Sequence, residues 1–133
     1  MASCINDVWK DYEWIEITHS IIHYLFAINQ LVSEKWYARA VDISNNLNIT
    51  AGSCSISIKN LLKKWFIKED ENKFIKLSTK WNKIVKSALY KREVLINFFQ
   101  NNLWLNEDIS NSEACKIEHL ISDEVINKIK EKF

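Results

Sequence analysis

The sequence has one glycine and no proline among its 133 residues. A β-sandwich or β-barrel normally needs many turns that contain these residues, so a fold made mostly of strands is disfavoured. Fourteen asparagines can supply turns between helices instead. A single glycine is also too few for a phosphate-binding P-loop or a dinucleotide-binding fingerprint. We therefore expect a mainly α fold without a nucleotide-binding loop.

Long apolar segments are missing as well. The longest apolar stretch, Ile21 to Ile28, is interrupted by His23 and is too short to span a membrane. The N-terminal sequence MASCINDVWKD has a single lysine and no apolar segment, unlike a secretory signal. Three cysteines at irregular spacing do not make a disulfide framework. These absences predict a cytoplasmic protein with no membrane contact.

The charges are balanced overall but unevenly distributed. The net charge is −3 over residues 1–58, +8 over residues 59–92 and −4 over residues 93–133, which sum to +1. A concentrated basic segment is typical of a surface that contacts a polyanion. The alternative is a solvated helix face without a partner.

The pattern of apolar residues predicts three helices in the first half of the chain. Spacings of three and four indicate a helix from about Glu16 to Ser33 and a short one at Ala40–Leu47. Asn48 is expected in the following turn because asparagine tolerates left-handed backbone, and Thr50 is expected to cap the next helix. One face of that third helix should carry Cys54, Ile58, Leu61 and Trp65.

After Trp65 the period changes to about two, which predicts a hairpin with strands at 66–68 and 73–77. Helix, short helix, turn, helix and hairpin are the order of a winged helix-turn-helix. The second helix of that motif, which is the third expected helix here, enters the major groove of DNA. Ile56 could touch a thymine methyl group there. The residues that we expect to contact phosphates or base edges are Thr50, Ser53, Ser55, Ile56, Ser57, Lys59, Lys63 and Lys73.

Helical patterns continue to the end of the chain. They predict a long helix at about 79–100 and two short helices at 112–120 and 122–132, the last capped by Ser122. We expect residues 1–86 to form an N-terminal extension plus the winged-helix domain, and residues 87–133 to form a helical domain. The extension contains Cys4, Trp9 and Trp14, for which the sequence suggests no role.

The string EACKIEHLISDEV carries the most specific chemistry. On a helix, Cys115, Glu118 and His119 stand at i, i+3 and i+4 and share one face. Thiolate, carboxylate and imidazole together can bind a divalent transition metal, whereas Mg²⁺ and Ca²⁺ prefer oxygen ligands alone. The alternative is a half-buried cysteine, a surface glutamate and an ordinary histidine.

This string, downstream of a winged helix, resembles the metal-binding segment of the diphtheria-toxin-repressor family, which includes iron-dependent repressors and manganese-transport regulators. The resemblance runs without gaps from about Thr18 to Phe133 and includes Tyr37-Ala38-Arg39 and Asp42-Ile43. It implies a dimeric, metal-activated repressor with a winged helix and a helical dimerisation domain. The chain ends before the SH3-like third domain of some members, so it resembles the two-domain form.

The resemblance also implies a ligand set. Cys115, Glu118 and His119 fall on three ligands of the family's primary metal site, and His23 falls on the fourth, where a methionine or an aspartate is more usual. Two nitrogens, one sulfur and one oxygen suit Fe²⁺ or Zn²⁺ better than Mn²⁺. His19, four residues before His23, could be a substitute ligand or simply a hydrogen-bonded or solvent-facing side chain.

Two departures from the family pattern have consequences. Arg92 stands where a histidine binds the family's second metal, with Ile96 and Asn111 at its partner positions, so we expect the second metal to be replaced by an ion pair of Arg92. Ile56 stands where a polar residue, often glutamine, is usual in the recognition helix.

The sequence thus predicts a homodimeric, metal-dependent regulator that binds a double-stranded DNA operator, with metal-uptake or metal-homeostasis genes as targets. Two alternatives stay open: a metal-independent or redox-responsive winged-helix regulator with a degenerate metal site, or a winged-helix protein-interaction module. An enzyme is not expected, because nothing suggests an oxyanion hole or a substrate cleft.

Overall fold

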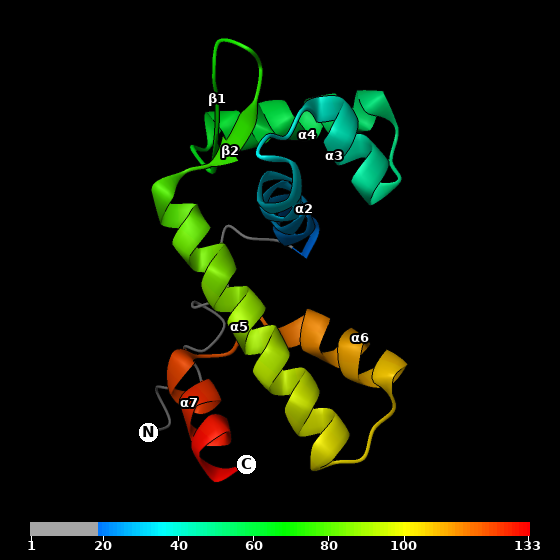
Figure 1. Ribbon diagram of the computed structural model, residues 1–133, viewed down its shortest axis with the longest axis vertical. Helices are drawn as coiled ribbons and strands as arrows, with labels where there is room; N and C mark the ends of the chain where they lie inside the picture. Colours follow the sequence, from blue (N-terminus) through cyan, green and yellow to red (C-terminus); the bar gives the residue numbers. More distant parts are fainter. Residues whose placement is uncertain (1–18) are drawn as a thin grey trace, which may run out of the picture.

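The structure, a computed structural model, describes residues 19–133 (Figure 1). The expected start of the first helix at Glu16, and Cys4, Trp9 and Trp14, lie outside the described residues. The described part is mainly helical with one small antiparallel hairpin, as the sequence predicts. Its elements are α2 (His19–Lys35), α3 (Ala40–Leu47), α4 (Ala51–Lys63), β1 (Ile67–Glu69), β2 (Ile75–Leu77), α5 (Thr79–Asn101), α6 (Glu107–Ile117) and α7 (Asp123–Lys132).

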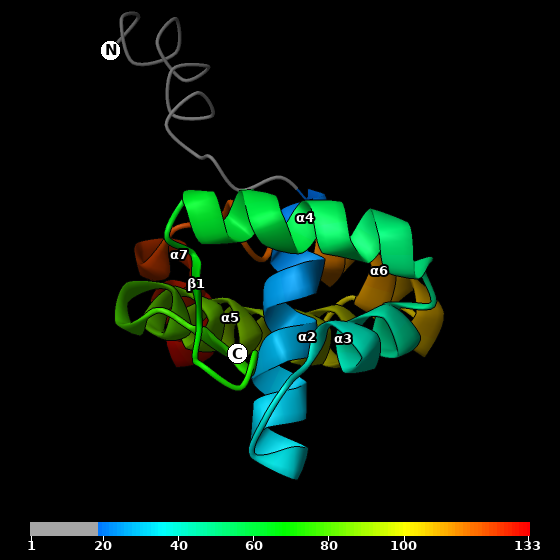
Figure 2. The same cartoon turned by 90° about the horizontal axis from the view of Figure 1, so that it is seen from above.

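Local signals fix the turn between α3 and α4. Asn48 has φ 55° and ψ 49°, the left-handed conformation expected of it. The Thr50 side chain accepts a hydrogen bond from the Ser53 backbone N–H at 3.2 Å and so caps α4. In Figure 2, α4 lies across the top of α2, and α3 and the hairpin flank α2. This arrangement is a helix-turn-helix with a wing.

The buried face of α4 is shorter than the periodicity predicts. Cys54, Ile58 and Leu61 are buried as expected, but Trp65 is 77% exposed. The prediction for Trp65 was wrong because α4 ends at Lys63 and Trp65 takes a left-handed φ of 63°, which turns it out of the helical register.

The wing also differs in detail from the expected hairpin. Its strands pair Ile67 with Leu77 and Glu69 with Ile75, so the loop between them covers residues 70–74. Asp70 accepts hydrogen bonds from the backbone N–H groups of Asn72 and Phe74, both at 2.9 Å, which lengthens the loop at the expense of the strands. Residues 73 and 74, expected in the second strand, lie in this loop.

Helix α5 connects the two halves of the molecule, as Figure 1 shows. Near its start, Val85 and Ala88 pack into the core of the winged helix with residues of α2, α3, α4 and the wing. Further along, Val94 and Leu95 pack with Ala114 of α6 and Ile126 of α7 in a second, smaller core. The buried side chains of α5 up to residue 88 thus pack in the first core, and those from residue 94 pack in the second. The expected domain boundary between residues 86 and 87 stays a prediction.

Helix α6 begins earlier and ends earlier than expected. Asn106 caps it by accepting a hydrogen bond from the Ile109 N–H at 2.8 Å, and Glu107 and Asp108 occupy its first turn, where carboxylates are favourable. The helix ends at Ile117, so Glu118 and His119 follow its last turn. Helix α7 begins after Ser122, which caps it as predicted.

None of the helices between residues 19 and 133 combines the length and the apolar character that a membrane crossing requires.

Candidate metal centre

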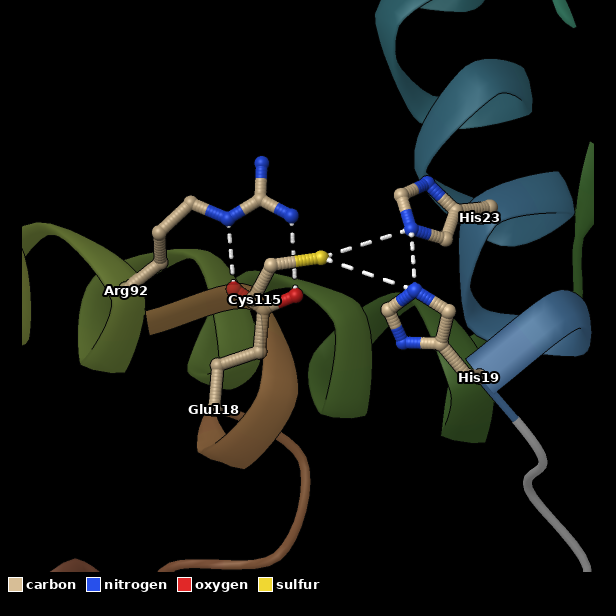
Figure 3. Close-up of polar contacts among 5 residues, drawn as sticks. All are labelled: His19, His23, Arg92, Cys115 and Glu118. Carbon is tan, nitrogen blue, oxygen red and sulfur yellow. Dashed lines mark hydrogen bonds and ion pairs between the residues drawn. The ribbon is translucent and has the colours of Figure 1, made fainter. Parts of the chain in front are cut away.

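Two histidines stand one helical turn apart at the start of α2. The Nε2 atoms of His19 and His23 are 3.0 Å apart, and the ring centroids are 4.5 Å apart in an edge-on arrangement. Their i, i+4 spacing places both imidazoles on one face of the helix (Figure 3). His19 is exposed and His23 is half-buried.

Cys115 reaches the same place from α6. Its Sγ lies 3.4 Å from His23 Nε2 and 3.7 Å from His19 Nε2, as Figure 3 shows. The donor atoms of these three residues all lie within 4.8 Å of one another, and no other such group of three occurs among residues 19–133. We call His19, His23 and Cys115 the three-donor cluster.

Burial shifts the pKa values of the cluster. Burial lowers the pKa of His23, the neighbouring His19 and Arg92 lower it further, and the Glu118 carboxylate opposes them. Burial raises the pKa of the Cys115 thiol, and the Glu118 carboxylate adds to this, while Arg92 opposes it. A neutral imidazole has a lone pair available for a metal, whereas the thiol must release its proton when a metal binds.

Glu118 is fully buried and is paired with Arg92 of α5. Its two carboxylate oxygens accept from Arg92 Nε at 2.5 Å and from Arg92 Nη2 at 2.8 Å. The hydrogen bond to Glu118 is the main reason that the pKa of Arg92 is raised. The ion pair that the sequence suggests for Arg92 is therefore formed with one of the four residues expected to bind the metal.

His119 lies near the cluster without joining it. Its ring centroid is 6.1 Å from that of His19. Its Nδ1 atom is buried and has no hydrogen-bond partner in the described part of the chain. Burial lowers the pKa of this histidine as well, which favours a neutral ring with a free lone pair.

The structure thus unites His23 and Cys115, two of the four expected ligands, and adds His19. The signal for His19 was present in the sequence as its spacing of four from His23. The expected ligands Glu118 and His119 stand outside the three-donor cluster. The four-residue ligand set stays a prediction.

The donor distances suit a tetrahedral metal. With Zn–N of about 2.0 Å and Zn–S of about 2.3 Å, a tetrahedral site separates two nitrogens by about 3.3 Å and nitrogen from sulfur by about 3.5 Å. The observed separations, 3.0 Å between nitrogens and 3.4 and 3.7 Å to sulfur, are close to these values. The donor set therefore fits a divalent transition metal in both chemistry and spacing.

The residues expected to contact DNA lie on α4, at its cap and in the wing. On α4, Ile56 is 64% exposed, so its side chain is available to a partner. Thr50 and Ser53 are also exposed, although the Thr50 hydroxyl donates to Ser53 Oγ at 2.9 Å. The other exposed positions are Ser55, Lys59, Lys63 and Lys73, while Ser57 is half-buried. Their contact with DNA stays a prediction.

The fold is similar to that of several solved structures. The IdeR protein of T. acidophilum superposes with a TM-score of 0.69 and 25% identity over 89% of this chain and 55% of that one. The manganese regulator SloR superposes with a TM-score of 0.70 and 23% identity over 83% of this chain and 51% of that one. The chain therefore spans about half the length of these structures, and the winged-helix and dimerisation-domain fold expected from the sequence is confirmed.

Sequence comparison identifies the family. Residues 81–133 match the family described as iron dependent repressor, metal binding and dimerisation domain. The HTH-type transcriptional regulator MntR of Shouchella clausii is 30% identical over 112 residues, which are 84% of this chain and 78% of that protein. The chain belongs to the DtxR/IdeR/MntR family of metal-dependent transcriptional regulators, which are not enzymes.

Proposed function

We propose that this protein is a DNA-binding transcriptional regulator whose affinity for DNA depends on a divalent metal held by His19, His23 and Cys115. One observation carries the proposal: donor atoms from α2 and from α6 converge to within 4.8 Å. Helix α2 belongs to the core of the winged helix, whereas α6 packs in the C-terminal core.

A metal at this place would tie the two halves of the chain together. Without it, only packing and the contacts along α5 hold α6 against α2. A metal can favour the DNA-binding arrangement only by binding it more tightly than other arrangements. The three-donor cluster meets this condition because its donors are complete only when α2 and α6 are in contact.

The cluster favours Fe²⁺ or Zn²⁺ over Mn²⁺. Imidazole and thiolate are borderline and soft ligands, and Mn²⁺ prefers oxygen. We assign the fourth position to His119, because its buried Nδ1 has no hydrogen-bond partner among residues 19–133 and its ring is close to that of His19. His119 would then be the fourth residue that holds the metal.

The DNA partner would be a double-stranded operator. Helix α4 and the wing offer the exposed hydroxyls and lysines described above, which can neutralise phosphates and position the helix in the major groove. Ile56 would then lie against a thymine methyl group. Such a regulator acts in the cytoplasm and would repress metal-uptake or metal-homeostasis genes.

Two copies would bind the two halves of an operator. Several large apolar side chains of the C-terminal half are exposed and could be covered in a homodimer. They are Leu103 (50% exposed), Trp104 (86%), Ile109 (45%), Val125 (45%) and Phe133 (68%).

Titration with Co²⁺ tests the metal site. We expect one metal per chain, with the absorption of a thiolate-bound ion. Cys115→Ser should remove that absorption, and Cys54→Ser, which changes the other described cysteine, should leave it unchanged. Absorption that persists in Cys115→Ser would contradict the proposed site.

A further inference from the structure

Beside the three-donor cluster lies an ion pair that already holds a potential ligand. Both oxygens of Glu118 accept hydrogen bonds from Arg92, in the bidentate geometry typical of a strong guanidinium–carboxylate pair. Glu118 has no exposed surface, so water does not compete for its oxygens. Each oxygen of the Glu118 carboxylate thus has a partner on Arg92.

Arg92 is itself held in place by contacts on two sides. Its guanidinium carbon lies 4.7 Å from the centre of the Phe26 ring, on α2, while its nitrogens pair with Glu118. Figure 3 shows the guanidinium and carboxylate together, with the Cys115 sulfur between this pair and the two histidines. The ion pair therefore adjoins the proposed ligands: Arg92 pairs with Glu118 and also hydrogen-bonds the Cys115 side chain, which opposes the rise in the pKa of that thiol.

We propose that Arg92 sets the metal preference of this centre by withholding the Glu118 carboxylate from the metal. This inference rests on the function proposed above and deepens it. Glu118 follows Cys115 by three positions at the end of α6, so its side chain and the sulfur start from the same side of the helix. In the structure the carboxylate is paired with Arg92 and lies outside the three-donor cluster.

The consequence follows from ligand chemistry. With Glu118 withheld, the cluster offers nitrogen and sulfur donors and no oxygen, a set that disfavours Mn²⁺. Arginine stays charged at every physiological pH, so the pairing cannot be released by loss of a proton. A released carboxylate, buried and unpaired, would need another cation, and a bound metal is the nearest one.

The test compares metal affinities of Arg92→Gln and the wild-type protein. Isothermal titration with Mn²⁺ and competition titration with Zn²⁺ give the ratio of the two dissociation constants. We expect Arg92→Gln to shift this ratio toward Mn²⁺ by roughly tenfold or more, the scale of effects from groups that surround metal ligands. Lys91→Gln is the matched control, because it removes the same charge from the adjacent position of α5, where Lys91 pairs with Asp123 and not with Glu118.

A double variant isolates the carboxylate. If released Glu118 supplies the new oxygen ligand, Arg92→Gln combined with Glu118→Gln should return the ratio to the wild-type value. Glu118→Gln alone should change both affinities by a similar factor and leave their ratio near the wild-type value, because Glu118 is not a ligand while Arg92 is present. This single variant also tests the inference if Arg92→Gln does not fold.

The outcomes distinguish this inference from the proposed function. A wild-type protein that binds metal through the three-donor cluster, with an unchanged ratio in Arg92→Gln, would overturn the inference alone. A shift of the ratio away from Mn²⁺ in Glu118→Gln would also overturn it, because Glu118 would then be an oxygen ligand of the wild-type site. A wild-type protein without metal binding at the cluster would overturn the proposed function and this inference with it.

Discussion

Cys115 and His23 are 92 positions apart in the sequence, yet Cys115 Sγ lies 3.4 Å from His23 Nε2. Cys115 is the only member of the three-donor cluster that comes from α6, and both histidines come from α2. Any metal that joins the two halves of the chain through this cluster must therefore bind Cys115.

Substitutions of different members of the three-donor cluster should have different effects on metal binding and on the metal response of DNA affinity. Cys115→Ser should leave the two histidines of α2 and the proposed ligand His119, which hold metal more weakly, so DNA affinity should respond to metal much less than in the wild-type protein. His19→Ala should weaken metal binding while some response remains, because His23 and Cys115 still span α2 and α6. Metal titration followed by DNA-binding titration separates the two effects. A full metal response in Cys115→Ser would show that the connection lies elsewhere.

Thiol alkylation offers a test that needs no DNA. Cys115 is half-buried, whereas Cys54 is 1% exposed and its Sγ lies 3.5 Å from the Ala40 carbonyl oxygen. Burial raises the pKa of Cys54, and the thiolate is the reactive form, so its alkylation should be slow at neutral pH and should accelerate as the pH rises toward that raised pKa.

In the metal-free protein we expect iodoacetamide to modify Cys115 faster than Cys54, as measured on separate peptides by mass spectrometry. Saturating Zn²⁺ should protect Cys115 and leave the rate at Cys54 unchanged. Equal rates at Cys115 with and without Zn²⁺ would argue against a metal–sulfur bond.

The folded structure also shows what the sequence could and could not predict. Caps and turns at Asn48, Thr50 and Ser122 are local, so the residues that form them predict them directly. The start of α6 carried a comparable signal in Asn106 and the two acidic residues after it, which periodicity alone did not use. Trp65 was misplaced because an apolar period does not reveal where a helix stops.

The candidate metal centre was harder to predict from the sequence, because it depends on how distant segments pack together. The spacing of His19 and His23 is local and visible in the sequence. Their approach to Cys115 depends on how α6 packs on α5 and α2, and only the family resemblance suggested it. The pairing joins Arg92 of α5 with Glu118, which follows α6 and is 26 positions further along the chain, and no local pattern indicates which carboxylate an arginine will pair with.

The basic surface predicts a strong salt dependence of DNA binding. Lys63, exposed in the last turn of α4, should neutralise about one phosphate, so Lys63→Ala should weaken binding similarly on all sequences and reduce the salt slope by about one ion. Lys73→Ala in the wing should behave alike. Lys128→Ala on α7 is the control and should change neither quantity. Binding that does not vary with salt would favour a protein-interaction module.

Whereas the lysines should affect DNA affinity on all sequences, Ile56 should affect which DNA sequence the protein prefers. Because its side chain is 64% exposed, Ile56→Gln should not unfold the protein. It should change the preference at a thymine-containing step by about 1–3 kcal/mol, measured by competition between oligonucleotides that differ at one base pair. Ile56→Val, which keeps an apolar contact, should retain the wild-type preference. An unchanged preference in Ile56→Gln would place this residue outside the groove.

The most direct test of the account is the DNA affinity of the wild-type protein with and without metal. The probe is a double-stranded oligonucleotide obtained by in vitro selection with Zn²⁺-loaded protein, and the readout is fluorescence anisotropy at fixed salt. The account predicts that excess EDTA weakens binding by at least about tenfold and that added Zn²⁺ restores it, a range usual for coupled sites. An affinity that is the same in EDTA and in Zn²⁺ would contradict the account.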